Sequence, residues 1–185
     1  ESVVRLLMPV KRPEDNVLLS PELPKKEGIA MSNINSLGFY NFFYFPQDWK
    51  AIYARYVSGE TTSPTEMERF YRRYKNLIAQ SMIEYNRQEF ISKFPPHTGS
   101  IRHLLAMFPE AKFIYIYRNP LMVFRSTVNF FETTHEALKL QPYSRPEFEE
   151  MVFELYEMLI RDYEIQKALI PQHHLVEIRY EDFES

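Results

Sequence analysis

Residues 111–131, AKFIYIYRNPLMVFRSTVNFF, carry the strongest fold signal in the sequence. The run from Ala111 to Arg118 is β-branched, aromatic and nearly all apolar, which predicts a strand buried on both faces. Asn119 and Pro120 follow at once and start a helix whose apolar residues form one stripe. A buried strand that passes directly into a helix is typical of a parallel α/β sheet.

The segments on either side of this stretch continue the alternation of strands and helices. EFISKF at 89–94 predicts a short strand, and Thr98 is placed to cap the helix that follows it. Near the end of the chain, HHLVEIRYEDF predicts a strand centred on residues 175–178. From residue 88 onward the order is strand, helix, strand, helix, helix, strand, which predicts a parallel sheet flanked by helices.

Two serines mark the starts of the longest predicted helices. Residues 63–66, SPTE, have the form of a capping box with proline at the first helical position, and they open an amphipathic helix of about 22 residues. Residues 144–147, SRPE, repeat this form. The second helix is expected to stop at Pro171, because proline cannot continue it.

Residues 1–62 carry a weaker pattern. The stretch NVLLSPELPKKEG favours a loop. The aromatic run GFYNFFYFPQDW at 38–49 is compatible with a buried strand, a short helix or a pocket wall, and its periodicity does not decide between them. We therefore predict a single domain over residues 1–185, with an irregular segment at 1–62 and an α/β core at 63–185.

Composition places the chain among ordinary globular proteins. Its 185 residues are 45% hydrophobic and 25% charged, and a net charge of −3 argues against nucleic acid or an anionic membrane as a partner. There are no cysteines, which excludes disulfides and thiolate metal sites. No stretch approaches the roughly 18 to 20 apolar residues of a membrane helix, so no membrane span is expected.

Arg118 stands where ligands bind in parallel sheets, beyond the carboxyl end of a strand. The N-terminus of the next helix offers N–H groups to an anion, and the arginine adds a planar fork of donors suited to phosphate. Ser126, eight residues later, is able to reach the same ligand. The alternative is an arginine that ends a strand and pairs with a carboxylate, with Ser126 an ordinary helix residue.

This stretch resembles the 3′-phosphate-binding segment of sulfotransferases that use 3′-phosphoadenosine-5′-phosphosulfate (PAPS). In that family Arg follows a hydrophobic strand and Ser comes eight residues later, and Arg118 and Ser126 match these two phosphate-binding positions. SKFPPHTGSIRHLLAMFPEAKFI at 92–114 is similar to the family run that leads into this strand. LVEIRYEDF at 175–183 is similar to the family segment whose tyrosine, here Tyr180, lies against adenine. The resemblance implies a P-loop-like sulfotransferase fold.

The resemblance also implies two catalytic residues, and residues 1–62 as the acceptor side of the domain. Lys93, expected on the same sheet edge as Arg118, matches the family lysine of this segment and would contact the transferring sulfuryl group. His97 is the candidate base for the acceptor proton, since the pKa of histidine is ordinarily near 6.5. Simpler interpretations are a solvated charge for Lys93, a cap or packing residue for His97 and an edge-strand tyrosine without a ligand for Tyr180.

The sequence also departs from the family. Met122 stands where many relatives carry Asp, and no glycine-rich loop for the 5′-phosphosulfate is present. The chain ends at Ser185, before the usual C-terminal cofactor segment. These departures predict a truncated version of the fold, cut at both ends, that is not necessarily active alone.

The predicted function is transfer of a sulfuryl group from PAPS to a hydroxyl or amine of a small-molecule acceptor, without a metal. The pair His173-His174 lacks further ligands at useful spacing. Aromatic residues make up 16% of the chain, which favours a hydrophobic alcohol as the acceptor. A P-loop-type kinase and a non-catalytic scaffold stay open as alternatives. The expected location is cytoplasmic, and the oligomeric state stays open.

Overall fold

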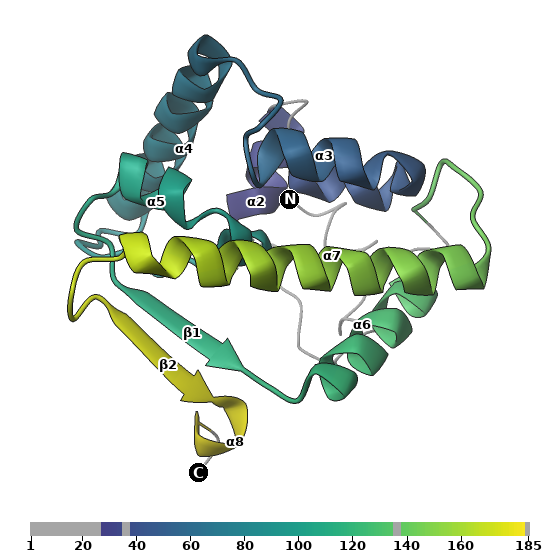
Figure 1. The fold of residues 1–185 in the computed structure, drawn as a ribbon. Coiled ribbons are helices and arrows are strands. Elements are labelled where there is room, and N and C mark those ends of the chain that lie inside the picture. The colour runs from purple at the N-terminus through teal and green to yellow at the C-terminus, as the bar shows by residue number, and fades with distance from the viewer. Residues whose placement is uncertain (1–26, 35–37, 135–137, 184–185) are drawn as a thin grey trace, which may run out of the picture.

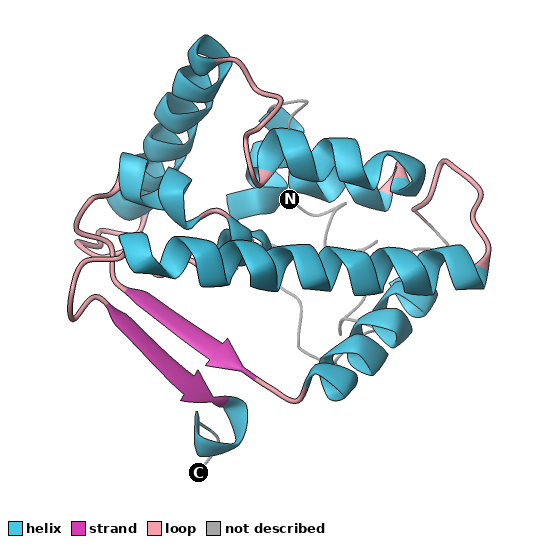
Figure 2. Cartoon of the chain, viewed as in Figure 1, coloured by secondary structure: helices cyan, strands magenta, loops and turns pink. Residues whose placement is uncertain are grey.

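The computed structural model describes residues 27–34, 38–134 and 138–183 (Figure 1). These ranges are mostly helical, with two short strands (Figure 2). The helices and strands are, in chain order, α2 (Glu27–Ile34), α3 (Trp49–Tyr56), α4 (Pro64–Glu84), α5 (Ile101–Met107), β1 (Phe113–Tyr117), α6 (Pro120–Thr134), α7 (Arg145–Gln166), β2 (Leu175–Arg179) and α8 (Tyr180–Phe183). None of the helices in these ranges has the length and apolar character needed to cross a membrane.

β1 and β2 form a parallel pair, in register from Phe113 opposite Leu175 to Tyr117 opposite Arg179. The connection between them contains α6 and α7, and α7 runs along one side of both strands (Figure 1). The ring of Tyr163 on α7 stacks on that of Tyr115, with 3.9 Å between centroids. The prediction of an α/β fold with a parallel sheet flanked by helices is therefore confirmed.

Two predictions about the strands are wrong. Residues 89–94 form no strand, because β1 pairs only with β2 among the described residues and a strand needs a neighbour for its backbone hydrogen bonds. β1 is also not buried on both faces: Ile114 is 72% and Ile116 42% exposed. The side chains of a strand alternate between faces, and the described residues cover mainly the face toward α7.

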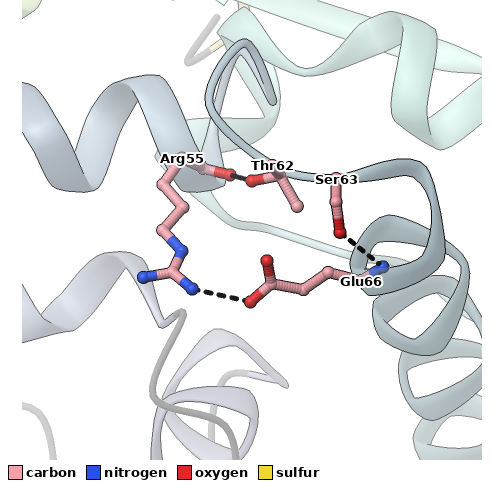
Figure 3. A network of polar contacts seen from close by, with 4 residues as sticks. All are labelled: Arg55, Thr62, Ser63 and Glu66. Atoms are coloured by element: carbon pink, nitrogen blue, oxygen red, sulfur yellow. Dashed lines mark hydrogen bonds and ion pairs between the residues drawn. The ribbon is translucent and has the colours of Figure 1, made fainter.

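The cap of α4 agrees in part with the sequence prediction. The Ser63 side chain accepts a hydrogen bond from the N–H of Glu66, as a capping serine does (Figure 3). The Glu66 carboxylate does not accept the second bond of a capping box, which would come from the backbone N–H of Ser63. It pairs with Arg55, the Nη2–Oε1 distance being 2.7 Å, and so ties the start of α4 to the end of α3 (Figure 3).

The caps of α7 and α5 differ from each other. Ser144 and Glu147 form a complete capping box at the start of α7, as predicted. Thr98 does not cap α5, because it lies inside the 3₁₀ helix Pro95–Gly99 and Ser100 takes the N-cap position. The Ser100 hydroxyl donates to the carbonyl of Pro96 instead of accepting a bond from the helix.

Replacing Ser144 with alanine is expected to destabilise the protein by about 1 kcal/mol, because its hydroxyl accepts a bond from the N–H of Glu147 and donates one to the Glu147 carboxylate. Ser63→Ala is the comparison, since only one bond of that box exists. Urea unfolding should show the larger loss for Ser144→Ala. Equal losses for the two variants would contradict an energetic role for the bond from the Ser144 hydroxyl to the Glu147 carboxylate.

The main core joins the N-terminal helices to α6 and α7. Trp49, Tyr53 and Val57 are buried against Phe148 and Phe131, which lie on α7 and α6. The expectation of an irregular segment is wrong for residues 27–34 and 49–56, which are helical. Their long-range packing partners, rather than local periodicity, stabilise these short helices. The division at residue 62 stays a prediction, and the core extends across it.

Candidate functional site

A cavity of about 600 Å³ opens beside the carboxyl end of β1. This volume is in the range of small-molecule sites. Its walls come from the 3₁₀ helix Phe39–Phe43, the end of β1, and the facing sides of α6 and α7. The aromatic run 38–49 therefore forms two short 3₁₀ helices and not a strand, and the first of these helices lines the cavity. Arg118 and Ser126 both line this cavity, so the structure brings these two predicted phosphate ligands together.

Arg118 directly follows β1 and precedes α6. Its guanidinium carbon lies 4.5 Å from the centre of the Tyr180 ring, a distance typical of a cation–π contact. Within the described residues Arg118 forms no ion pair with a carboxylate, so they do not support the alternative of a paired strand-end arginine. Its donors remain able to bind an anion in the cavity.

The turn from β1 into α6 has a local reason in the sequence. Pro120 occupies the first helical position, and the side-chain oxygen of Asn119 accepts a bond of 3.0 Å from the N–H of Leu121. Ser126 follows on the next turns, exposed, and its hydroxyl has no hydrogen-bond partner within the described part of the chain. It is therefore able to bond a ligand in the cavity.

Tyr180 opens α8 rather than ending an edge strand, so the edge-strand interpretation is wrong. β2 runs parallel to β1, which brings its carboxyl end to the same side of the sheet as Arg118. The ring is half-buried and stacks with the Arg118 guanidinium. The three predicted nucleotide ligands, Arg118, Ser126 and Tyr180, therefore lie around one end of the sheet.

Lys93 and His97 do not line this cavity. Lys93 is exposed and lines a second cavity, of about 520 Å³, which shares no wall residue with the first. The expectation that Lys93 shares a sheet edge with Arg118 is wrong, because residues 89–94 form no strand. His97 is absent from the walls of both cavities, although its neighbours Pro96 and Thr98 line the first.

His97 is held in a partly buried polar network. Its Nε2 lies 3.2 Å from the hydroxyl of Tyr74, and its Nδ1 lies 3.1 Å from the hydroxyl of Ser92. Burial lowers the pKa of His97 to about 4, and the nearby Glu27 carboxylate opposes this only in part. With both ring nitrogens engaged, the residue fits its simpler interpretation as a neutral packing histidine.

Sequence reasoning missed Glu27, which completes this network. Its carboxylate accepts a bond from the Ser92 hydroxyl and a longer one, 3.4 Å, from Tyr74. Glu27 is only 8% exposed, and it lies 65 residues from Ser92 and 47 from Tyr74 in the sequence. No local motif signals such a contact. The described residues also hold no cluster of three metal-ligating side chains.

Comparison with known proteins identifies the family. The model of the sulfotransferase family matches residues 46–185. Over 179 residues the chain is 28% identical to the omega-hydroxy-beta-dihydromenaquinone-9 sulfotransferases Stf3 of Mycobacterium bovis and Mycobacterium tuberculosis. This alignment covers 97% of the chain but 46% of each relative, so the chain spans about half the length of these proteins. No solved structure matches. Because the family model covers most of its length, the chain belongs to the sulfotransferase family.

Proposed function

We propose that the protein transfers a sulfuryl group from PAPS to the hydroxyl of a small apolar acceptor. The observation that carries this proposal is the placement of Arg118 and Ser126 on the wall of one cavity, with Tyr180 against the arginine. Membership of the sulfotransferase family supports the same chemistry. A cytoplasmic location is also part of the proposal.

Arg118 and Ser126 are the proposed ligands of the 3′-phosphate. The arginine supplies a charged pair of donors and the serine a hydroxyl, and neither is occupied by a hydrogen-bonding partner within the described residues. The Arg118 guanidinium lies over the Tyr180 ring, which stabilises it through a cation–π contact, and Tyr180 stays the proposed contact of adenine. The residues present therefore fit the 3′ end of such a nucleotide.

The chemistry of transfer depends on charge and position. When bound, PAPS would supply the sulfuryl group and a phosphate as the leaving group. The protein would supply cationic groups that stabilise the charge spread over the sulfuryl oxygens. Lys93 is the proposed cation for this purpose, and its exposure leaves it able to reach a ligand. His97 stays a predicted catalytic residue, and the bonds to both of its nitrogens favour a supporting role.

The proposed acceptor is an apolar alcohol. The mycobacterial relatives are named for an omega-hydroxylated dihydromenaquinone. The walls of both cavities in this chain carry many aromatic and aliphatic side chains, which favour an apolar molecule over a sugar. A hydroxyl on an otherwise apolar molecule matches both observations.

Replacing Arg118 with alanine is expected to weaken binding of 3′-phosphoadenosine 5′-phosphate, the product nucleotide, by about tenfold or more. This loss corresponds to roughly 1.5–3 kcal/mol for hydrogen bonds to a charged group. Isothermal titration calorimetry measures it. Arg125→Ala is the matched control, because Arg125 is exposed on the same helix but does not line the cavity.

If Arg118→Ala and Arg125→Ala weakened nucleotide binding equally, the loss would come from the overall positive charge and not from a specific contact of Arg118. Absence of binding to the unmodified protein would contradict the nucleotide site. Binding without any transfer of sulfate to a panel of apolar alcohols would favour the non-catalytic scaffold.

A further inference from the structure

The second cavity has the features of a ligand site. It lies between α2, α4 and the segment that follows α4, and its apolar wall is formed by Leu77, Ile78, Met82, Tyr85, Phe90 and Ile91. Its volume of about 520 Å³ suits a small organic molecule. Ile91 is apolar yet 93% exposed, so a molecule that covered it would gain from the hydrophobic effect.

Glu27 provides a buried polar group on this wall. Its Oε1 accepts the bonds from Ser92 and Tyr74, whereas its Oε2 has no hydrogen-bond partner within the described ranges. The residue is 8% exposed and lines the second cavity. A buried carboxylate oxygen without a donor is costly, and a hydroxyl on a bound ligand would satisfy it.

The His97 network holds Glu27 in place. The Ser92 hydroxyl donates its hydrogen to Glu27, so the Ser92 oxygen accepts the bond from His97 Nδ1–H. The Nε2 atom of His97 is then an acceptor, and the single hydrogen of the Tyr74 hydroxyl is shared between it, at 3.2 Å, and Glu27, at 3.4 Å. This arrangement makes His97 a positioning residue for Glu27 and leaves it no nitrogen for a ligand.

The charges on the cavity wall favour a neutral ligand. Arg87 and Lys93 bring two positive charges, and Glu27 and Glu89 bring two negative ones. An ammonium or a carboxylate would gain attraction from one pair and repulsion from the other. A hydroxyl donates to Glu27 without carrying net charge into the site.

We propose that the second cavity binds the apolar alcohol that accepts the sulfuryl group, with its hydroxyl donating to Glu27. This proposal rests on the function proposed above. As the alcohol oxygen forms its bond to sulfur, Glu27 takes the hydroxyl proton. The sulfur–oxygen bond to the phosphate of PAPS breaks, and its electron pair leaves with the phosphate. Lys93, on the same cavity wall, stabilises the sulfuryl oxygens.

Binding of 1-decanol, followed by saturation-transfer NMR without nucleotide, tests the cavity. Ala30→Leu adds three carbons to the cavity wall and is expected to weaken binding more than tenfold. Ala79→Leu, on an exposed position of α4 outside the wall, is the matched control and should leave binding unchanged. The proposal would be overturned if Ala30→Leu left the affinity for 1-decanol unchanged, or if 1-decanol did not bind to the unmodified protein.

Turnover with PAPS and 1-decanol tests the role of Glu27. Glu27→Gln keeps the shape of the side chain, and kcat is expected to fall about 10²–10⁴-fold because the base is lost. Binding of 3′-phosphoadenosine 5′-phosphate should stay unchanged. A fall of less than about tenfold would remove Glu27 as the base.

The two proposals fail in different ways. If nucleotide binding depends on Arg118 but Ala30→Leu leaves decanol binding unchanged, the sulfotransferase function stands and the second cavity is not the acceptor site. If decanol binds in the cavity but no nucleotide binds and no sulfate is transferred, the cavity is a lipid site and the proposed function is lost. Circular dichroism checks that each variant is folded, and Ala30→Leu keeps the binding test decisive if Glu27→Gln does not fold.

Discussion

Replacing Tyr53 with alanine is expected to lower the free energy of unfolding by about 3–5 kcal/mol, as for other large aromatic truncations. Tyr53 is 1% exposed and lies at the centre of the core between α3 and α7. Its hydroxyl also donates a bond of 2.6 Å to Asp162 on α7. The variant therefore loses packing and leaves a partly buried carboxylate without this donor.

Tyr53→Phe separates these two contributions. The phenylalanine keeps the ring and removes only the bond to Asp162, so we expect a loss of about 1.5–3 kcal/mol, the range for a hydrogen bond to a charged group. Urea unfolding followed by circular dichroism measures both variants. If Tyr53→Phe cost as much as Tyr53→Ala, the ring would contribute nothing and the core assignment would be contradicted.

The same experiment addresses the domain organisation. Trp49 is the single tryptophan and lies in the segment 1–62, so its fluorescence reports on that segment, while circular dichroism reports on all helices. A core shared across residue 62 predicts that the two transitions coincide in the unmodified protein and shift together in Tyr53→Ala. A fluorescence transition at lower urea would show that the N-terminal helices unfold alone.

Acidification from pH 7 to pH 4 is expected to remove roughly 3 kcal/mol of stability through His97 alone. The unfolded residue titrates at 6.5, whereas burial lowers the pKa of the folded residue to about 4. Between these values the unfolded state binds more protons, so stability rises with pH. The contribution is complete above pH 6.5 and is lost as the pH falls toward 4.

The groups that face His97 support the prediction that stability falls as the pH is lowered. Tyr74 and Ser92 contact its ring nitrogens, and Glu27 is the charged group of the network. The negative charge of Glu27 favours the protonated histidine, but burial is the larger cause and keeps the ring neutral. His103, whose pKa burial also lowers, adds a slope of the same sign.

Urea unfolding at several pH values measures the slope. His97→Asn removes the titrating group, and stability should then vary less between pH 4 and 6.5 than in the unmodified protein. His173→Asn is the matched control, since His173 is exposed in the turn before β2. An unchanged slope in His97→Asn would show that His97 is not the source of acid sensitivity.

Features that depend on neighbouring residues were predictable from the sequence. Ser63 and Ser144 cap their helices because a side chain and an N–H three residues away decide the bond. The strand β1 and the helix α6 follow from apolar patterning and from Pro120. Arg118 and Ser126 meet at one cavity because a single strand–turn–helix unit places both of them.

Features that depend on distant contacts were not predictable in the same way. Residues 89–94 have the composition of a strand but no strand beside them in the described residues, and a strand needs a partner for its backbone bonds. Lys93 therefore lines a different cavity from Arg118, and His97 lines neither cavity, despite their matching positions in the sequence. Composition alone could not decide whether the aromatic run 38–49 forms a strand, a helix or a wall.

Strand β1, helix α6 and the Arg118–Ser126 pair could be predicted from the sequence, because they arise from patterns within about 20 residues. The tertiary structure alone decided the second cavity, where Glu27 meets Ser92 across 65 residues of sequence. The physical reason is that hydrogen bonds and burial depend on which atoms are close in space. Short-range patterns specify helices and strands, and packing decides which of their side chains share a site.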